Sequence, residues 1–472
     1  MEIGQSSAAS DMPARRPAQR TSAIRGLASA VLLLGLSQTP LASAVSTCSA
    51  SSDWFPHSQT PRPDDSAFES TSNCVFHQWS WQMFLWLTQE VDGQPRFLSF
   101  ASPQSLLGMQ QRGMLPRMTK SATPESFEEY LQAGTDGILV DQQGRAVYYS
   151  QYLNATLTDF INDNGLTDPA KVRAMNPTLQ FPITDKKGSL ELKVSWKIVA
   201  EGEDVSDMFT MTTEVAKLVN QGGKIVIDLG QTERVQVALV GFHIGGIVNG
   251  HPEMIWATFE HKDNAPNVPA KYEPHTVISD QDFTFYKAGT TYANCNRNPA
   301  SSSLLKLDEA TQILSPITQV CRQYEFGNDP NSTDSSIKTN DANIASINAD
   351  VAKQMAADDV WRNYFEVGAI WFLDGSKLKP GLNLEDDKLL TGSLRLSNAT
   401  IETFTQTQSV LNNCFRCHNT QQEFPPNMSL DPLPATDINI SHAFQNIYFW
   451  SQEGIGNTAS MKNKDVEGGA GK

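Results

Sequence analysis

Two cysteines and a histidine near the C-terminal end of the 472-residue chain, Cys414, Cys417 and His418, form a Cys-x-x-Cys-His motif. Cysteines at this spacing can each bond covalently to a vinyl group of haem, and the adjacent histidine can then ligate the iron. The same pair could instead be a thioredoxin-like redox centre or half of a zinc site. A redox centre is expected near a βαβ pattern and a four-cysteine zinc site needs a second close pair, and neither is apparent. We therefore expect haem c, attached at Cys414 and Cys417, with His418 as an iron ligand.

The second axial ligand of the iron is not fixed by the motif. His442, Met428 and Met461 are the candidates in the C-terminal region, and methionine ligation would raise the reduction potential relative to two histidines. We favour His442 because it begins an amphipathic segment and is the only other histidine after residue 275. An open iron site and a ligand from another part of the chain remain alternatives.

The N-terminus indicates the compartment. An arginine-bearing lead is followed by an apolar run, Leu27 to Leu36, and by Ala42-Ser43-Ala44, which is a small-x-small cleavage signal. Residues 1–44 are thus predicted to be a secretory signal peptide, and the protein to be periplasmic or secreted. The apolar run is too short to span a bilayer, so no integral membrane segment is expected after cleavage.

The chain is strongly acidic. Its formal net charge is −16, and removal of the signal peptide changes this to about −18. Such a charge disfavours nucleic acid and anionic membranes as partners and suits a redox partner with a basic docking face. The acidity is equally compatible with a role in solubility alone.

Four cysteines remain outside the motif: Cys48, Cys74, Cys295 and Cys321. In an exported protein they are expected to form disulfides, and three connectivities are possible. The simplest pairs neighbours, Cys48 with Cys74 and Cys295 with Cys321, each 26 residues apart. Free buried cysteines are the alternative.

The sequence pattern of most of the mature chain indicates β-structure. We expect a β-rich, largely antiparallel body over residues 45–325, because no helices long enough for regular crossovers separate the later strands. A mostly buried helix is expected over residues 77–87. Strand-like patterns occur at residues 146–149, 190–199, 235–247, 254–261 and 282–286.

A separate haem module is expected at the C-terminal end. Residues 326–343 have the composition of a polar linker, residues 344–452 would form a small helical module, and residues 453–472 a disordered tail. Within the module, one helix would begin at Asn398 or Thr400 and end at the motif, and another would span about Ile438 to Trp450. The predicted fold class is α+β, with a β-rich body followed by a cytochrome c-like module.

Several segments resemble a group of exported bacterial proteins of the cytochrome c family. The resemblance rests on Leu239 to Ile244, Trp256 to Pro266, Gly144 to Asn154 and Val194 to Lys197, and on the closing motifs C-x-x-C-H and S-H-x-F. It spans about residues 75–450. It implies haem attachment at Cys414, Cys417 and His418, but no substrate, since the group has no established reaction.

Two functions are compatible with these patterns. The first is an electron-transfer protein that cycles one electron at Fe(II)/Fe(III) with an unknown redox partner. The alternative is a haem-dependent oxidoreductase, peroxidase- or oxygenase-like, with a substrate pocket in the β-rich body.

The oxidoreductase would need an acid–base group near the iron, for which His243, Glu260 and His261 are the candidates. His243 and His261 could approach each other on paired strands. We favour the simpler interpretation that all three are structural, with Glu260 pairing with Lys197 or capping a turn. No hydrolase motif is present, and electron transfer is the expected function.

Overall fold

The computed structural model describes residues 48–69, 72–109, 115–116, 137–183, 187–299, 304–384, 387–406, 413–425 and 430–452. The predicted signal peptide (1–44), the predicted tail (453–472), Met428 and Met461 lie outside the described residues.

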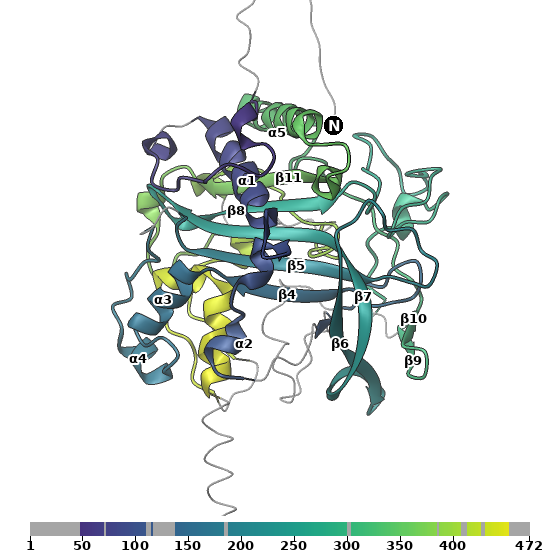
Figure 1. The fold of residues 1–472 in the computed structure, drawn as a ribbon, viewed down its shortest axis with the longest axis horizontal. Coiled ribbons are helices and arrows are strands. Elements are labelled where there is room, and N and C mark those ends of the chain that lie inside the picture. The colour runs from purple at the N-terminus through teal and green to yellow at the C-terminus, as the bar shows by residue number, and fades with distance from the viewer. Residues whose placement is uncertain are drawn as a thin grey trace, which may run out of the picture. The chain divides into compact units, whose positions relative to one another are not determined.

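An antiparallel sheet forms the centre of the fold (Figure 1). Within the described residues its strand order is β12-β11-β8-β7-β5-β4-β3, and β6 pairs with β7 beside this path. The strands are β3 (Leu115–Pro116), β4 (Tyr148–Leu153), β5 (Leu190–Ile198), β6 (Thr210–Gln221), β7 (Lys224–Val248), β8 (His251–His261), β11 (Tyr364–Phe372) and β12 (Leu390–Gly392). Two short hairpins complete the strands: β1 (Glu90–Val91) with β2 (Gln94–Pro95), and β9 (Lys306–Asp308) with β10 (Ile313–Ser315).

Both faces of the sheet are buried, and side-chain alternation assigns residues to them. On β8, Ile255, Ala257 and Phe259 belong to one hydrophobic cluster, whereas Trp256 belongs to the other. This is the alternation expected from the period of two along a strand. The first cluster packs against α1, and the second against the C-terminal segment.

Helices cover the two faces. On the first face α5 lies beside α1 (Figure 1), and both contact β11. On the second face the helix over residues 442–452 packs with α3 in one apolar cluster. The labelled α-helices are α1 (Asn73–Thr88), α2 (Pro103–Leu106), α3 (Ala155–Asp163), α4 (Pro169–Ala174) and α5 (Ser335–Gln354).

Much of the predicted pattern is confirmed. The protein is β-rich and antiparallel, with strands close to residues 190–199, 235–247 and 254–261 and a buried helix that includes residues 77–87. At residues 282–286 the structure has only an isolated bridge between Phe283 and Tyr286, and β6 was not predicted.

The region expected to be a helical module contributes to the sheet instead. Residues 335–343 of the predicted linker are the first turns of α5, and β11 and β12 extend the central sheet. The expectation of helix was wrong at β11 for a physical reason. A strand buried on both faces has a continuous apolar sequence, and periodicity cannot distinguish such a run from a buried helix. The helix expected from Asn398 or Thr400 to the motif is not formed over residues 398–406, which are turns and a bend after Asn398. Residues 407–412 lie outside the described residues.

The expected second helix is confirmed in part. Asp437–Ile440 form the 3-10 turn η9, and an α-helix runs over residues 442–452.

Two disulfides connect the cysteines as the simplest pairing predicted, Cys48 with Cys74 and Cys295 with Cys321. The first ties the irregular segment before α1 to that helix. Disulfides are typical of oxidising compartments. None of the described helices is both long and apolar enough to cross a membrane.

Candidate haem site

The Cys-x-x-Cys-His motif lies in a short turn packed on the sheet. Its first residues form the 3-10 turn η8 (Cys414–Arg416), and Asn413 caps this turn by accepting the Phe415 N–H at 3.1 Å. The Phe415 side chain is fully buried, with its ring centroid 5.0 Å from that of Phe372 on β11. Burying a phenylalanine contributes about 1.5–3 kcal/mol, so Phe415 anchors the motif to the sheet.

His418 is held between two rings. Its ring centroid lies 3.7 Å from that of Trp256 on β8 and 3.8 Å from that of His442. Its Nδ1 lies 2.8 Å from the carbonyl oxygen of Ile440. Burial, followed by the charge of His442, holds the pKa of His418 well below its usual range, so the imidazole is neutral.

The hydrogen bond to Ile440 assigns the tautomer of His418. A carbonyl oxygen can only accept, so Nδ1 carries the hydrogen and Nε2 has the lone pair. A neutral imidazole whose second nitrogen donates to a backbone carbonyl is the usual form of a metal-ligating histidine. The geometry therefore leaves Nε2 of His418 suited to bind iron.

His442 also lies beside the motif, and its ring stacks against the His418 ring. Two axial ligands of one iron would instead face each other across the metal. The two imidazole planes are 20° from parallel, and His442 Nε2 lies 3.2 Å from the carbonyl oxygen of Cys417. Since metal–imidazole bonds are about 2 Å long, rings on opposite sides of one iron would have centroids roughly 6 Å apart. Ligation of the iron by both histidines would need the His442 ring to turn out of this stack.

Glu191 holds the start of the helix that bears His442. It is on β5, and its buried carboxylate accepts a short hydrogen bond from Ser441 Oγ. Burial raises the pKa of Glu191 to about 7, although hydrogen bonds from Ser441 and from the backbone of Ala443 and His442 oppose this shift. Glu191 thus fixes the backbone of His442 relative to the sheet.

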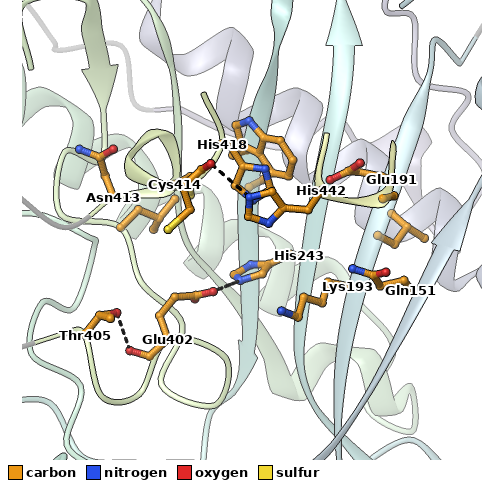
Figure 2. A pocket seen from close by; sticks show the side chains of 16 residues that line it. Gln151, Glu191, Lys193, His243, Glu402, Thr405, Asn413, Cys414, His418 and His442 are labelled. Atoms are coloured by element: carbon orange, nitrogen blue, oxygen red, sulfur yellow. Dashed lines mark hydrogen bonds and ion pairs between the residues drawn. The ribbon is translucent and has the colours of Figure 1, made fainter. Parts of the chain in front are cut away.

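A cavity adjoins the motif (Figure 2). It holds about 780 Å³ of empty space, which includes open solvent at its mouth. The cavity is lined by Gln151, Glu191, Leu192, Lys193, His243, Trp256, Ala257, Leu396, Glu402, Thr405, Asn413, Cys414, Cys417, His418, His442 and Ala443.

The sheet register explains why polar groups meet in this cavity. Gln151 on β4 is opposite Lys193 on β5, and Lys193 is opposite His243 on β7. Residues directly opposite each other point to the same face of a sheet. These three side chains therefore form one row, facing the motif.

His243 forms an ion-pair contact with Glu402 across the cavity wall (Figure 2). Its Nε2 lies 3.0 Å from each carboxylate oxygen, and the two side chains are 15% and 17% exposed. Of the three predicted acid–base candidates, His243 alone lines the cavity with the motif.

Glu260 has a structural environment. Its Oε2 accepts hydrogen bonds from Arg322 Nε and Nη2 at 3.1 and 2.6 Å, and its Oε1 accepts the Ala399 N–H at 2.6 Å. The suggested pairing with Lys197 is wrong, because Lys197 pairs with Glu203.

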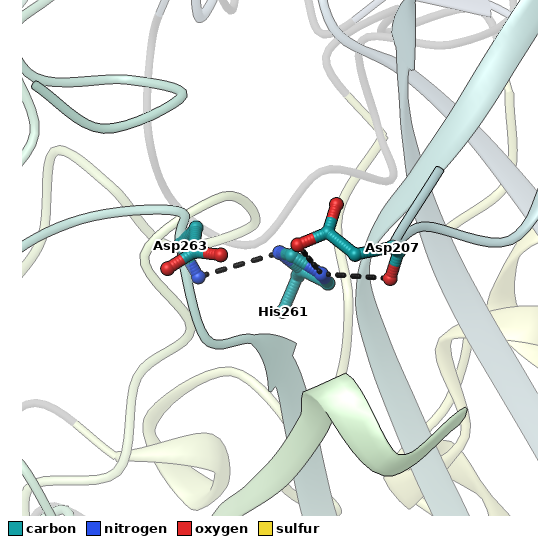
Figure 3. Close-up of side chains that lie close together, drawn as sticks. All are labelled: Asp207, His261 and Asp263. Atoms are coloured by element: carbon teal, nitrogen blue, oxygen red, sulfur yellow. Dashed lines mark hydrogen bonds and ion pairs between the residues drawn. The ribbon is translucent and has the colours of Figure 1, made fainter. Parts of the chain in front are cut away.

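His261 points away from the cavity, to the other face of β8. Its Nε2 is 3.1 Å from the Asp207 carbonyl oxygen, and its Nδ1 accepts the Asp263 N–H at 3.3 Å (Figure 3). His261 therefore does not approach His243, and the predicted approach of these two histidines on paired strands is wrong. Asp207, His261 and Asp263 cluster as metal ligands would, but both ring nitrogens are engaged and Lys262 pairs with both carboxylates at 3.1 Å. The cluster is thus a neutralised ion-pair network.

Glu191 and Glu402 were not identified from the sequence. The alternation over residues 190–199 places Glu191 and Lys193 on the same face, which was the available signal. Nothing in the sequence near Glu402 indicates that it meets His243.

The residues around the cavity fit haem better than zinc or a thiol redox centre. Burial raises the pKa of Cys414 well above its usual range, the opposite of a reactive redox thiol. Ligand atoms of the motif do not converge as those of a zinc site would; among the described residues only Asp207, His261 and Asp263 do so. For haem, Cys414 and Cys417 border the cavity, His418 offers Nε2, and Lys193, a cation, also lines the cavity.

The buried wall of the cavity contains a polar group without a hydrogen-bond partner among the described residues. The indole N–H of Trp256 has no hydrogen-bond partner within the described residues. Unpaired buried donors are uncommon in folded proteins, and this one lies in the ring that packs against His418.

Comparisons of the chain with family models, curated proteins and solved structures found no match.

Proposed function

We propose that this protein is an exported monohaem c-type cytochrome that transfers single electrons through haem attached at Cys414 and Cys417. The observation that supports it is the state of His418, which lies with both cysteines at one cavity, neutral and with Nδ1 bonded to Ile440. The bound haem would supply the Fe(II)/Fe(III) couple.

The chain's own residues would bind and orient that group. Thioethers at Cys414 and Cys417 fix its edge, and His418 Nε2 ligates the iron. The carbonyl of Ile440 and the ring of Trp256 restrain the His418 imidazole from two directions. The apolar side chains of Trp256 and Leu396, on the face of the motif, would limit water at the haem.

The haem module is proposed to be a composite and not an independent helical domain. The motif and the helix over residues 442–452 supply one side, and β5, β7 and β8 supply the other. The sheet would therefore be needed for haem binding as well as for docking.

The candidates for the second axial ligand of the iron are the same as those predicted from the sequence. His442 is at the cavity and is preferred among the chain's ligands, although its ring must turn to coordinate. Met428 and Met461 are alternatives, as are an open site and a ligand from another part of the chain. A partner with basic surface charge, in the periplasm or outside the cell, fits the net charge of −16.

The test is expression of the full chain with a working haem-maturation system. Mass spectrometry of the denatured protein should show covalent haem, and Cys414→Ala with Cys417→Ala should abolish it. His418→Ala should lose the normal low-spin reduced spectrum, whereas His275→Ala, at an exposed histidine, should not. Absence of covalent haem from the wild-type protein would refute the proposal.

A further inference from the structure

His243 differs in its hydrogen bonding from the well-packed histidines outside the cavity. Both ring nitrogens of a structural histidine normally have partners. This holds for His57, His77, His251 and His261. In His243 only Nε2 is bonded, to Glu402, and within the described residues Nδ1 has no hydrogen-bond partner.

The contact with Glu402 assigns the role of each nitrogen. When His243 is neutral, the carboxylate accepts from Nε2–H, which leaves the lone pair on Nδ1. A base oriented by a carboxylate, with its second nitrogen available, is the arrangement used for proton transfer in enzymes.

Glu402 is itself fixed to the sheet. Its Oε2 accepts the Asn398 N–H at 2.9 Å. The Asn398 amide donates to Thr258 Oγ1 at 2.8 Å and to the Phe259 carbonyl at 3.0 Å, both on β8. The pair is therefore held by the scaffold, as a preorganised acid–base group must be.

The pair faces the proposed haem from a different part of the chain. His243 comes from β7, while His418 comes from the C-terminal segment, and both line the same cavity (Figure 2). The charge of His243 also contributes to lowering the pKa of His418. The cavity is partly open to solvent, so a small molecule can enter it.

We infer that His243 and Glu402 form the acid–base pair of a hydroperoxide-reducing site at the haem; this inference rests on the proposed haem attachment, with the sixth iron position open and not occupied by His442. The net reaction is ROOH + 2 H⁺ + 2 e⁻ → ROH + H₂O. The O–O bond breaks, and a reduced one-electron donor protein supplies both electrons, one at a time; the bound haem would supply the redox couple that accepts them. His243 Nδ1 accepts the proton of the hydroperoxide and delivers it to the oxygen that leaves. Solvent supplies the two further protons of the products, whether R is hydrogen or alkyl.

The balance of protons follows from this reaction. The hydroperoxide already holds one O–H hydrogen, and two protons are taken up with the two electrons. For an alkyl hydroperoxide, the alcohol keeps one hydrogen and water keeps two, which accounts for all three. His243 relocates one proton in each turnover and is regenerated.

The pair is tested by two measurements on the covalently loaded protein. The first is hydrogen peroxide-dependent oxidation of a reduced c-type cytochrome. The second is the rate at which cyanide binds the ferric haem, because hydrogen cyanide must lose its proton to bind as the anion. His243→Leu should lower both rates by about 10²- to 10⁴-fold, the range for loss of a general acid–base group.

A second variant and a control complete the design. Glu402→Gln keeps the shape of the pair but removes its charge, and it should lower both rates by a smaller factor. His275→Ala, at an exposed histidine, should change neither. Haem content measured by mass in every variant separates failure of this inference from failure of haem attachment.

Three results would overturn the inference. One is a haem-loaded wild-type protein that neither reduces peroxide nor binds cyanide, which would mean a closed iron site. The second is an unchanged rate in His243→Leu. The third is conversion of a low-spin spectrum to a high-spin one in that variant, which would make His243 an iron ligand and not a base.

Discussion

The buried ion pair between Arg322 and Glu260 gives the sharpest stability prediction. The two side chains are 3% and 0% exposed. Arg322 donates two hydrogen bonds to Oε2 of Glu260 and a third, from Nη1, to Asn267 Oδ1 at 2.6 Å. Its guanidinium carbon also lies 4.8 Å from the centroid of the Phe365 ring.

Arg322→Ala would leave the Glu260 carboxylate buried with the Ala399 N–H as its remaining donor. Removing one partner of a buried pair costs about 3–5 kcal/mol, since the other charge stays uncompensated. The double variant Arg322→Met with Glu260→Gln removes both charges. It should cost less than Arg322→Ala alone, because no buried charge is left without a partner.

The measurement is the free energy of unfolding in urea with both disulfides intact. The control is Arg173→Ala, which breaks an exposed pair with Asp431 at 3.0 Å, where the side chains are 40% and 62% exposed. That change should cost about 0–1 kcal/mol. The reasoning is refuted if Arg322→Ala destabilises the protein no more than Arg173→Ala, or if the double variant is the least stable of the three.

Two further predictions concern the polar contacts of single buried side chains. Burial lowers the pKa of the fully buried His77, but the charge of Glu366 and hydrogen bonds to Glu366 and Asn340 outweigh it, so the net shift is upward from 6.5. The interaction therefore stabilises the fold fully below the pKa of the unfolded state, and this stabilisation is lost as the pH rises through the raised pKa of the folded state. His77→Gln should therefore lower the free energy of unfolding more at about pH 5.5 than at about pH 9. An equal loss at both pH values would contradict the ion pair. Ser441 Oγ accepts the Phe444 N–H at 3.1 Å and donates to Glu191, so Ser441→Ala should lower the free energy of unfolding by about 1–2 kcal/mol. A loss near zero in urea titration would show that this cap does not stabilise the helix.

The sequence alone determined features that depend on neighbouring residues. The Cys414, Cys417 and His418 spacing is a local pattern, and so is the alternation that places Trp256 and Ile255 on opposite faces of β8. The disulfide pairing was also predictable, because the simplest connectivity joins neighbouring cysteines.

The partners of the site were decided by the tertiary structure. Glu402 meets His243 from 159 residues away, and Ser441 meets Glu191 from 250 residues away. Such contacts depend on strand register, and a shift of one residue would turn Lys193 and His243 to the other face of the sheet. The tertiary structure also decided that β11 is a strand. Its apolar run is compatible with a helix or a strand, and pairing with the backbone of β8 selects the strand.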